Sequence, residues 1–162
     1  MAYHTLSSQF KTSVVAIILL FSSLSYASEA PFSVSGAKTI DVGEAKYLYD
    51  NGALFLDVRS EDEWAIGHVT GAIHLDLASG FEALFSASND EKGTPVVIYC
   101  NSPESLRAAF ASAVSVQWGF TNVFFFRGGY FSWMTSDYPT YMGYSESVKA
   151  NFDSARAIKT VN

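Results

Sequence analysis

Cys100 is the only cysteine in this 162-residue chain, and its surroundings suit a nucleophile. An apolar run from Pro95 to Tyr99 leads up to it and predicts a buried strand. A short polar loop over residues 101–105 follows, and the sequence from Leu106 predicts a helix. A thiol between a strand end and a helix N-terminus faces unpaired backbone N–H groups and the positive end of a dipole. That environment favours the nucleophilic thiolate. We therefore expect an enzyme built around one activated sulfur.

Charge and composition exclude several other classes of function. The chain carries 10 basic and 16 acidic residues, a formal charge of −6, and no basic run. Such a protein is poorly suited to nucleic acid or an anionic membrane, so we expect neither as a partner. His68 and His74 have no spacing typical of a zinc site, and we expect no metal and no cofactor. A lone cysteine cannot form an internal disulfide. The alternative, a buried structural cysteine, is disfavoured by the polar residues that follow Cys100.

Residues 1–27 predict a signal peptide. Lys11 gives a weak positive start, and the apolar stretch from Val14 to Phe21 is too short to span a bilayer. Ser25-Tyr26-Ala27 then offers the small residues that a signal peptidase reads. We expect cleavage after Ala27 and an exported protein, periplasmic if the source is a Gram-negative bacterium, with no membrane contact once the signal is removed. An uncleaved membrane anchor is the alternative.

Helix and strand signals alternate through the rest of the chain. Residues 41–44 and 60–63 are capping-box patterns that begin helices, and the apolar runs at 53–58 and 95–99 predict strands covered on both faces. Other segments predict a short strand at 72–75, a loosely helical stretch at 81–85, a polar loop at 86–94, a strand at 122–126 and a turn at 127–129. This alternation indicates one α/β domain, a central parallel sheet with helices on both faces. Ligands bind such sheets at the carboxyl ends of the strands, where Cys100 falls.

The helix after Cys100 has the clearest periodicity. Its expected buried face consists of the apolar residues Leu106, Ala109, Phe110, Ala113 and Val114. The polar residues of the same helix, Ser112, Ser115 and Gln117, lie off that face.

Two stretches resemble the rhodanese-like sulfurtransferase domain family. The first is Leu56-Asp57-Val58-Arg59, followed by Glu63-Trp64 and Gly67-His68-Val69-Thr70-Gly71-Ala72. The second is Tyr99-Cys100, followed by Gly119-Phe120-Thr121-Asn122-Val123 and by Arg127-Gly128-Gly129-Tyr130 through Trp133. The resemblance covers about residues 35–140. It divides the chain into a signal peptide (1–27), a single rhodanese-like domain (28–140) and a C-terminal extension (141–162) that is a weak helix or disordered.

The resemblance implies a thiosulfate sulfurtransferase. In this family the cysteine attacks the outer sulfur of a small anionic donor such as thiosulfate, becomes a persulfide, and passes that sulfur to cyanide or a thiol. Cys100 would then be the catalytic nucleophile and sulfur carrier. Backbone N–H groups of the loop would hold the persulfide, and a guanidinium would grip the sulfonate end of the donor. The expected substrate-binding residues are Asn101, Ser102, Glu104, Ser105, Leu106 and Arg107.

The loop departs from the commonest family pattern, in which the arginine lies closer to the cysteine. It is closer to a subset, often exported, that reads Cys-Asn-x-Pro-x-Cys-x-Arg, but Ser105 replaces the second cysteine. That loss removes a resolving thiol. A second function therefore stays open, a sulfane-sulfur carrier or binding module that acts with a thiol-bearing partner protein and has little turnover. A third, a cysteine phosphatase of the same fold, is disfavoured because its Cys–Arg spacer is shorter.

Four charged or titratable residues near the site have simpler expected roles. Asp57 and Arg59 are expected to form a structural ion pair at the strand end. His68 is expected to hydrogen-bond the backbone. Glu104 would oppose ionisation of the thiol unless it points to solvent.

Overall fold

The computed structural model describes residues 29–143, so the predicted signal peptide and nearly all of the predicted extension lie outside the described residues. In chain order the elements are β1 (Ala37–Ile40), α2 (Val42–Asp50), β2 (Leu54–Asp57), α3 (Glu61–Ile66), β3 (His68–Val69), β4 (Ile73–His74), the 3₁₀ helix η1 (Phe81–Ser86), α4 (Asn89–Lys92), β5 (Val96–Tyr99), α5 (Arg107–Gln117), β6 (Val123–Phe126), α6 (Gly129–Thr135) and β7 (Thr140–Tyr141).

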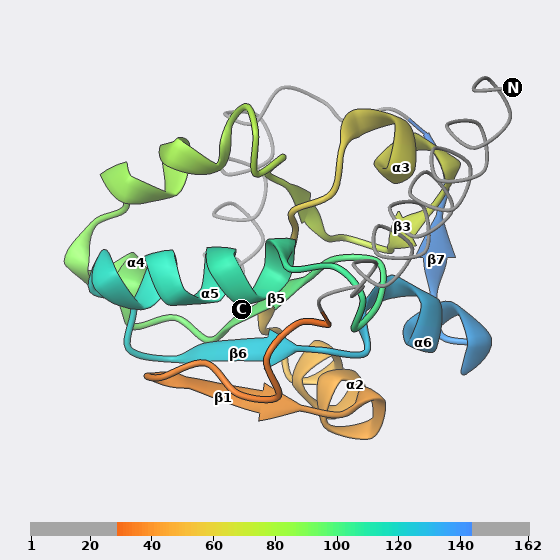
Figure 1. Cartoon of the computed structure of the whole chain (residues 1–162), viewed down its shortest axis with the longest axis horizontal. Coiled ribbons are helices and arrows are strands. Elements are labelled where there is room, and N and C mark those ends of the chain that lie inside the picture. The colour runs from red at the N-terminus through yellow and green to blue at the C-terminus, as the bar shows by residue number, and fades with distance from the viewer. Residues whose placement is uncertain (1–28, 144–162) are drawn as a thin grey trace, which may run out of the picture.

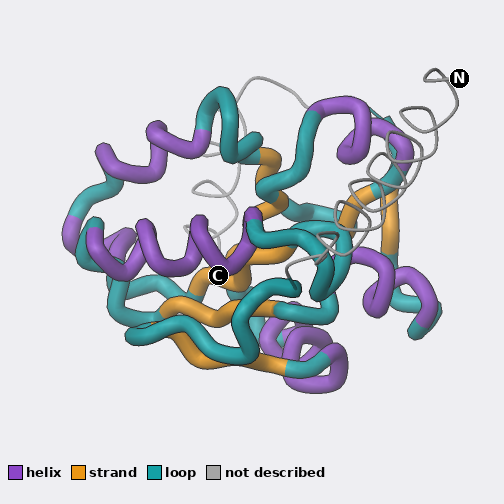
Figure 2. Tube along the Cα trace, viewed as in Figure 1, coloured by secondary structure: helices purple, strands orange, loops and turns teal. Residues whose placement is uncertain are grey.

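A five-stranded parallel sheet forms the centre of the fold, with strand order β1-β6-β5-β2-β4 (Figure 1). Figure 2 shows its strands in orange between purple helices. A separate two-stranded antiparallel ribbon pairs β3 with β7 and places His68 opposite Tyr141, the first residue of the predicted C-terminal extension. The predicted α/β class, with a central parallel sheet and helices on both faces, is confirmed.

The side chains of β5 alternate between two apolar layers. Val96 and Ile98 belong to the layer that includes α5 and η1, whereas Val97 and Tyr99 belong to the layer that includes α2 and α6. Figure 1 shows α5 and α2 on opposite sides of β6. Successive side chains of a strand point to opposite faces. Cys100, directly after β5, therefore keeps the direction of Ile98 and packs in the α5 layer.

Capping boxes begin three of the helices in the described part of the chain: Asp41 with Glu44 at α2, Ser60 with Glu63 at α3, and Ser88 with Glu91 at α4. The first two confirm the sequence prediction. The third lies inside residues 86–94, where we expected a polar loop, and α4 is only four residues long. Its Ser-x-x-Glu pattern could have revealed it, but the lack of an apolar face conceals so short a helix.

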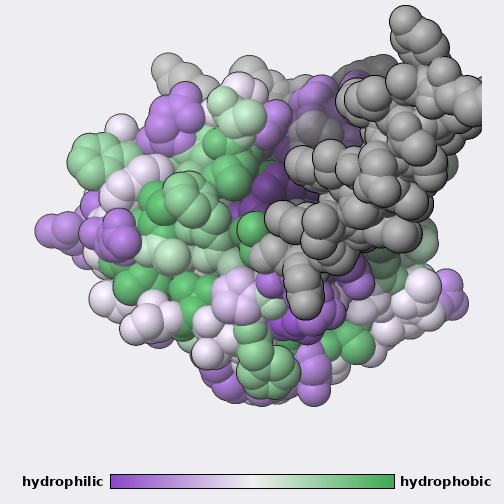
Figure 3. All heavy atoms as spheres, viewed as in Figure 1, coloured by the Kyte–Doolittle hydropathy of each residue, from purple (hydrophilic) through white to green (hydrophobic). Residues whose placement is uncertain are grey.

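The expected buried face of α5 is right for Ala109, which is buried, and for Ala113 and Val114, which pack against the core, but wrong at Leu106 and Phe110. Leu106 and Phe110 are 49% and 60% exposed, whereas Ala108, Ser112 and Ser115 are buried. Both serine hydroxyls donate to the backbone carbonyl four residues earlier, at 2.7 and 2.9 Å, so neither is left unpaired by burial. Small side chains let the helix lie close to the sheet, whereas the larger Leu106 and Phe110 face outward. Figure 3 shows apolar groups, in green, gathered on the face that carries α5.

Neither β1 nor α6 was expected from the sequence. β1 is an edge strand of four residues, Ala-Lys-Thr-Ile, with only Ile40 buried, so it lacks the apolar run that marks the inner strands. α6 begins inside the expected turn at 127–129, and its first residue, Gly129, has a left-handed φ of +64°.

Candidate active site

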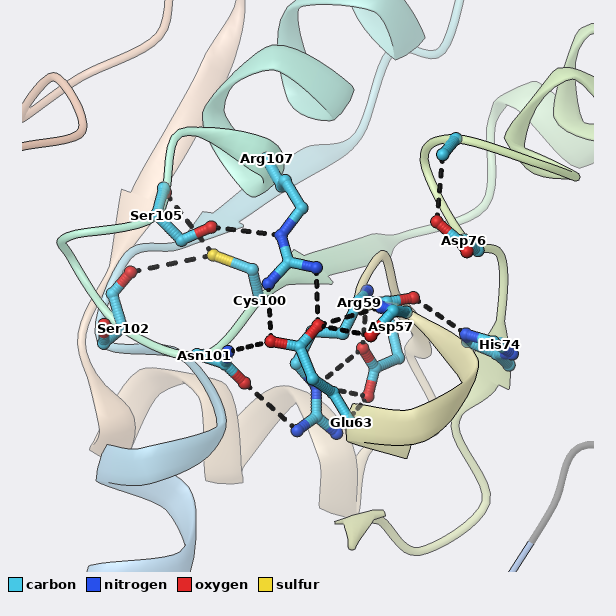
Figure 4. A network of polar contacts seen from close by, with 12 residues as sticks. Asp57, Arg59, Glu63, His74, Asp76, Cys100, Asn101, Ser102, Ser105 and Arg107 are labelled. Carbon is cyan, nitrogen blue, oxygen red and sulfur yellow. Dashed lines mark hydrogen bonds and ion pairs between the residues drawn. The ribbon is translucent and has the colours of Figure 1, made fainter. Parts of the chain in front are cut away.

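Cys100 lies where β5 ends, and the loop 101–106 joins it to α5 (Figure 4). The residue is only 1% exposed and packs in the apolar layer of α5, so the expectation that the polar residues after Cys100 would keep it from being buried is wrong. Its Sγ lies 3.7 Å from the carbonyl oxygen of Ser102 and 3.5 Å from that of Ser105. Both oxygens are acceptors within reach of the single S–H proton, which a thiol donates to one of them at a time. These partners differ from the backbone N–H groups that we expected, because the alternation of β5 turns the side chain inward beneath the loop.

The first turn of α6 holds the backbone on which Cys100 sits. The N–H of Tyr130 donates to the Cys100 carbonyl at 2.8 Å, and the N–H of Phe131 donates to the Asn101 carbonyl at 3.0 Å. A Cβ on Gly129 would lie 2.5 Å from the Cys100 carbonyl oxygen, too close for any side chain. Gly129 therefore permits the close approach of α6 to the loop 101–106, which we call the reactive loop because it directly follows Cys100, the nucleophile expected from the sequence. Sequence reasoning missed this role, although two glycines directly after a strand were a usable signal.

Arg107 lies beside Cys100, as its place in the sequence predicted (Figure 4). Its guanidinium is held by Glu63 of α3 through two parallel contacts, Nη1 to Oε2 at 2.6 Å and Nη2 to Oε1 at 2.8 Å. The Nε of Arg107 also donates to Ser105 Oγ at 3.3 Å. The hydrogen bonds from Arg107 hold the pKa of the Glu63 carboxyl far below its usual range, and Glu63 in turn raises the pKa of Arg107. Glu63 is thus a member of the site, where sequence reasoning gave it only a capping role.

Asn101 joins this ion pair to a second one. Its Nδ2 donates to Glu63 Oε1 at 2.5 Å, and its Oδ1 accepts from Arg59 Nη1 at 3.2 Å. Arg59 in turn pairs with Asp57, Nη2 to Oδ2 at 2.6 Å, and both side chains are almost fully buried. The ring of Tyr130 lies 4.3 Å from the Arg59 guanidinium. The predicted structural pair is confirmed, and Asn101 ties it to the reactive loop.

The remaining predicted binding residues divide into two groups. Ser102 and Ser105 contact the sulfur through their carbonyl oxygens, and the Ser105 hydroxyl also meets Arg107. Glu104 and Leu106 are exposed instead. A hydrogen bond from Ser102 lowers the pKa of Glu104, so its carboxylate stays charged in solvent.

The chain matches the family of the rhodanese-like domain over residues 41–136. This chain belongs to that family.

Two bacterial relatives of the rhodanese-like domain carry the name thiosulfate sulfurtransferase GlpE. That of Pseudomonas fluorescens (strain SBW25) is 34% identical over 106 residues, which cover 65% of this chain and 92% of the relative. That of Pseudomonas aeruginosa (strain LESB58) is 33% identical over 96 residues, covering 59% and 82%. The names of these relatives support sulfurtransferase activity for this chain.

Solved structures agree on the fold. The Alr3790 protein from Anabaena sp. superposes with a TM-score of 0.56 at 19% identity, covering 76% of this chain and 94% of that one. The human single-domain sulfurtransferase TSTD1 gives 0.54 at 22% identity, covering 61% and 96%.

In this rhodanese-like domain His68 has the predicted backbone contact. Its Nδ1 lies 3.0 Å from the carbonyl oxygen of Trp64, and its ring stacks on the Trp64 indole with centroids 3.4 Å apart. Burial lowers the pKa of His68 and favours the neutral ring. A neutral, stacked and hydrogen-bonded imidazole serves the framework.

Within residues 29–143, no group of three or more His, Cys, Asp or Glu side chains is arranged to hold a metal ion. Over the same stretch, none of the helices has the length and hydrophobicity that a membrane span requires.

Proposed function

We propose that this rhodanese-like protein is a thiosulfate sulfurtransferase that carries sulfane sulfur as a persulfide on Cys100. One observation carries the proposal: the sole thiol and the Arg107 guanidinium meet at the carboxyl end of the parallel sheet (Figure 4). That edge is where α/β sheets bind ligands. The names of the bacterial relatives support the same reaction.

The reaction has two displacements at sulfur. The Cys100 thiolate attacks the outer sulfur of thiosulfate, the S–S bond of the donor breaks, and sulfite leaves with the bonding electron pair. The acceptor, cyanide or a thiolate, then attacks the outer sulfur of the persulfide, and the Cys100 thiolate is released. Arg107 offers parallel N–H donors to the sulfonate end and to the departing sulfite.

Ionisation of Cys100 must change the contacts of its sulfur. A thiolate cannot donate to the carbonyls of Ser102 and Ser105, which hold the thiol at 3.7 and 3.5 Å. The Ser102 and Ser105 carbonyls lie in the loop between β5 and α5. Turning them aside breaks the bond that the Ser102 carbonyl accepts from the Ser105 N–H at 3.1 Å, but it leaves the sheet and the helix intact. We infer that this loop offers backbone N–H groups once the sulfur is charged.

Turnover tests the proposal directly. The purified protein is expected to convert thiosulfate and cyanide to sulfite and thiocyanate, and Cys100→Ser is expected to lose this activity while keeping the urea midpoint of the parent. Full activity in the variant would contradict the proposal, because no other thiol exists in the chain.

One observation favours a second candidate, the sulfane-sulfur carrier. Both Nη atoms of Arg107 already contact Glu63, so a free anionic donor must compete with a carboxylate. A carrier would show negligible turnover with thiosulfate but rapid sulfur uptake from a persulfidated partner protein. Rapid turnover with thiosulfate alone would exclude it.

We also propose export, on the signal-peptide pattern of residues 1–27. N-terminal sequencing of the protein from its own cells is expected to begin at Ser28. An intact N-terminus would contradict this.

A further inference from the structure

The group that should bind the donor is already occupied by the chain itself. Glu63 places one carboxylate oxygen on each Nη atom of Arg107, at 2.6 and 2.8 Å. A sulfonate would use the same two parallel donors. An anionic donor must therefore displace Glu63 from Arg107 or share the guanidinium with it.

Glu63 is also held firmly where it is. Its Oε2 accepts from the N–H of Ser60 at 3.0 Å and from the Ser60 hydroxyl at 2.9 Å, and its Oε1 accepts from Asn101. These bonds fix the carboxylate beside the reactive loop when Arg107 turns to a donor. The negative charge of Glu63 therefore stays in the site during sulfur transfer.

The charges around the sulfur then sum to a negative value. With Cys100 as thiolate, Glu63 contributes a second negative charge and Arg107 one positive charge, while Asp57 and Arg59 cancel each other. Repulsion grows with the charge of the donor. Thiosulfate, with two negative charges, is penalised more than a donor with one.

We propose that Glu63 is a specificity-determining residue that sets the charge of the preferred donor. By holding Arg107 and keeping the site negative, it favours singly charged sulfane-sulfur donors, such as organic thiosulfonates and persulfides, over thiosulfate. This inference rests on the proposed sulfurtransferase function and deepens it. The reaction with a thiosulfonate balances in the same way, since the Cys100 thiolate takes the outer sulfur and a sulfinate leaves with the electron pair.

Glu63→Gln tests the proposal, because glutamine also serves in a capping box but carries no charge. Glu91→Gln is the matched control, since Glu91 makes the same two bonds to its own N-cap serine, both at 2.7 Å. Loading of Cys100 is measured by single turnover with thiosulfate and with methanethiosulfonate. We expect Glu63→Gln to lower the half-saturation concentration of thiosulfate about tenfold and that of methanethiosulfonate about threefold, since the Coulomb energy scales with donor charge. Glu91→Gln should change neither.

A second measurement separates this inference from the reaction itself. In the Cys100→Ser background, calorimetry compares sulfate, a dianion, with methanesulfonate, a monoanion. Glu63→Gln is expected to raise the affinity for sulfate more than the affinity for methanesulfonate. The specificity role would be overturned if Glu63→Gln left the ratio of the dianion affinity to the monoanion affinity unchanged in both experiments, or if it weakened the binding of both ligands equally. Either result would leave the sulfurtransferase proposal standing. Failure of both donors to load the parent protein would overturn the sulfurtransferase and this inference together.

Discussion

Two carboxylate–guanidinium pairs lie side by side in this domain, joined by the amide of Asn101, and they differ in burial. The side chains of Asp57 and Arg59 are 0% and 2% exposed, whereas those of Glu63 and Arg107 are both 31% exposed. Two pairs with the same functional groups therefore differ in how readily they can be broken. A buried pair is costly to break because each charge is left without water, while a half-exposed pair can exchange its partner for a ligand.

The hydrogen bonds of the two pairs show the same contrast. Asp57 accepts from the backbone N–H of Arg59 as well as from its guanidinium, and Arg59 Nη2 also donates to the Gly67 carbonyl at 2.6 Å. These bonds tie β2 to the segment after α3. Arg107, in contrast, has its partner on a different element and stands beside the sulfur. We therefore expect the buried pair to support the fold and the half-exposed pair to serve the proposed reaction.

The largest expected effect comes from breaking the buried pair. Asp57→Asn leaves the Arg59 guanidinium buried without a counter-charge, and we expect a loss of about 3–5 kcal/mol in the free energy of unfolding, measured with urea. Asp50→Asn is the control, because it removes an exposed pair with Lys46 and should cost no more than about 0.5 kcal/mol. Equal small losses in both variants would remove the contrast between the pairs.

Breaking the half-exposed pair should affect donor binding far more than stability. For Arg107→Ala we expect a loss of about 1.5–3 kcal/mol in binding the sulfonate, as for hydrogen bonds to charged groups, seen as a rise of about 10- to 150-fold in the thiosulfate KM. The free energy of unfolding should fall by about 1 kcal/mol or less. Arg107→Lys should recover only part of the binding, because lysine lacks the planar fork. An unchanged KM in Arg107→Ala would show that Arg107 does not hold the donor.

The smallest effect is on acid stability. Arg107 lowers the pKa of Glu63 below its ordinary value of 4.5, so Glu63 contributes stability that is complete above that value and is lost as the pH falls toward its lowered pKa in the fold. Between about pH 6 and about pH 3 the parent should therefore lose more stability than Glu63→Gln, by urea titration at each pH. If the parent and Glu63→Gln lost the same stability over this pH range, the Glu63–Arg107 pair would contribute nothing to the stability of the fold.

Local patterns predicted the α/β fold well because its inner strands are apolar runs and because the sequence revealed two of its three capping boxes, at 41–44 and 60–63. The meeting of Cys100 and Arg107 was also predictable, since a strand, a loop and a helix in sequence place both residues at one end of the sheet. Other features were hidden. Ser112 and Ser115 look like surface residues, yet each pairs its hydroxyl within α5 and is buried.

The role of Glu63 could not be found from local sequence. Its contact with Arg107 spans 44 positions of the chain and depends on how α3 packs over the reactive loop. The direction of the Cys100 side chain, in contrast, was within reach. The alternation of β5 already assigns its sulfur to the face of Ile98, beneath α5.

The central claim is that Cys100 accepts sulfane sulfur, and the intact mass of the full protein measures this most directly. After treatment with thiosulfate and removal of the excess, the mass should rise by one sulfur atom, return to its starting value with cyanide, and stay constant in Cys100→Ser. A parent protein whose mass does not change with thiosulfate, or a serine variant that gains the same mass, would contradict the account.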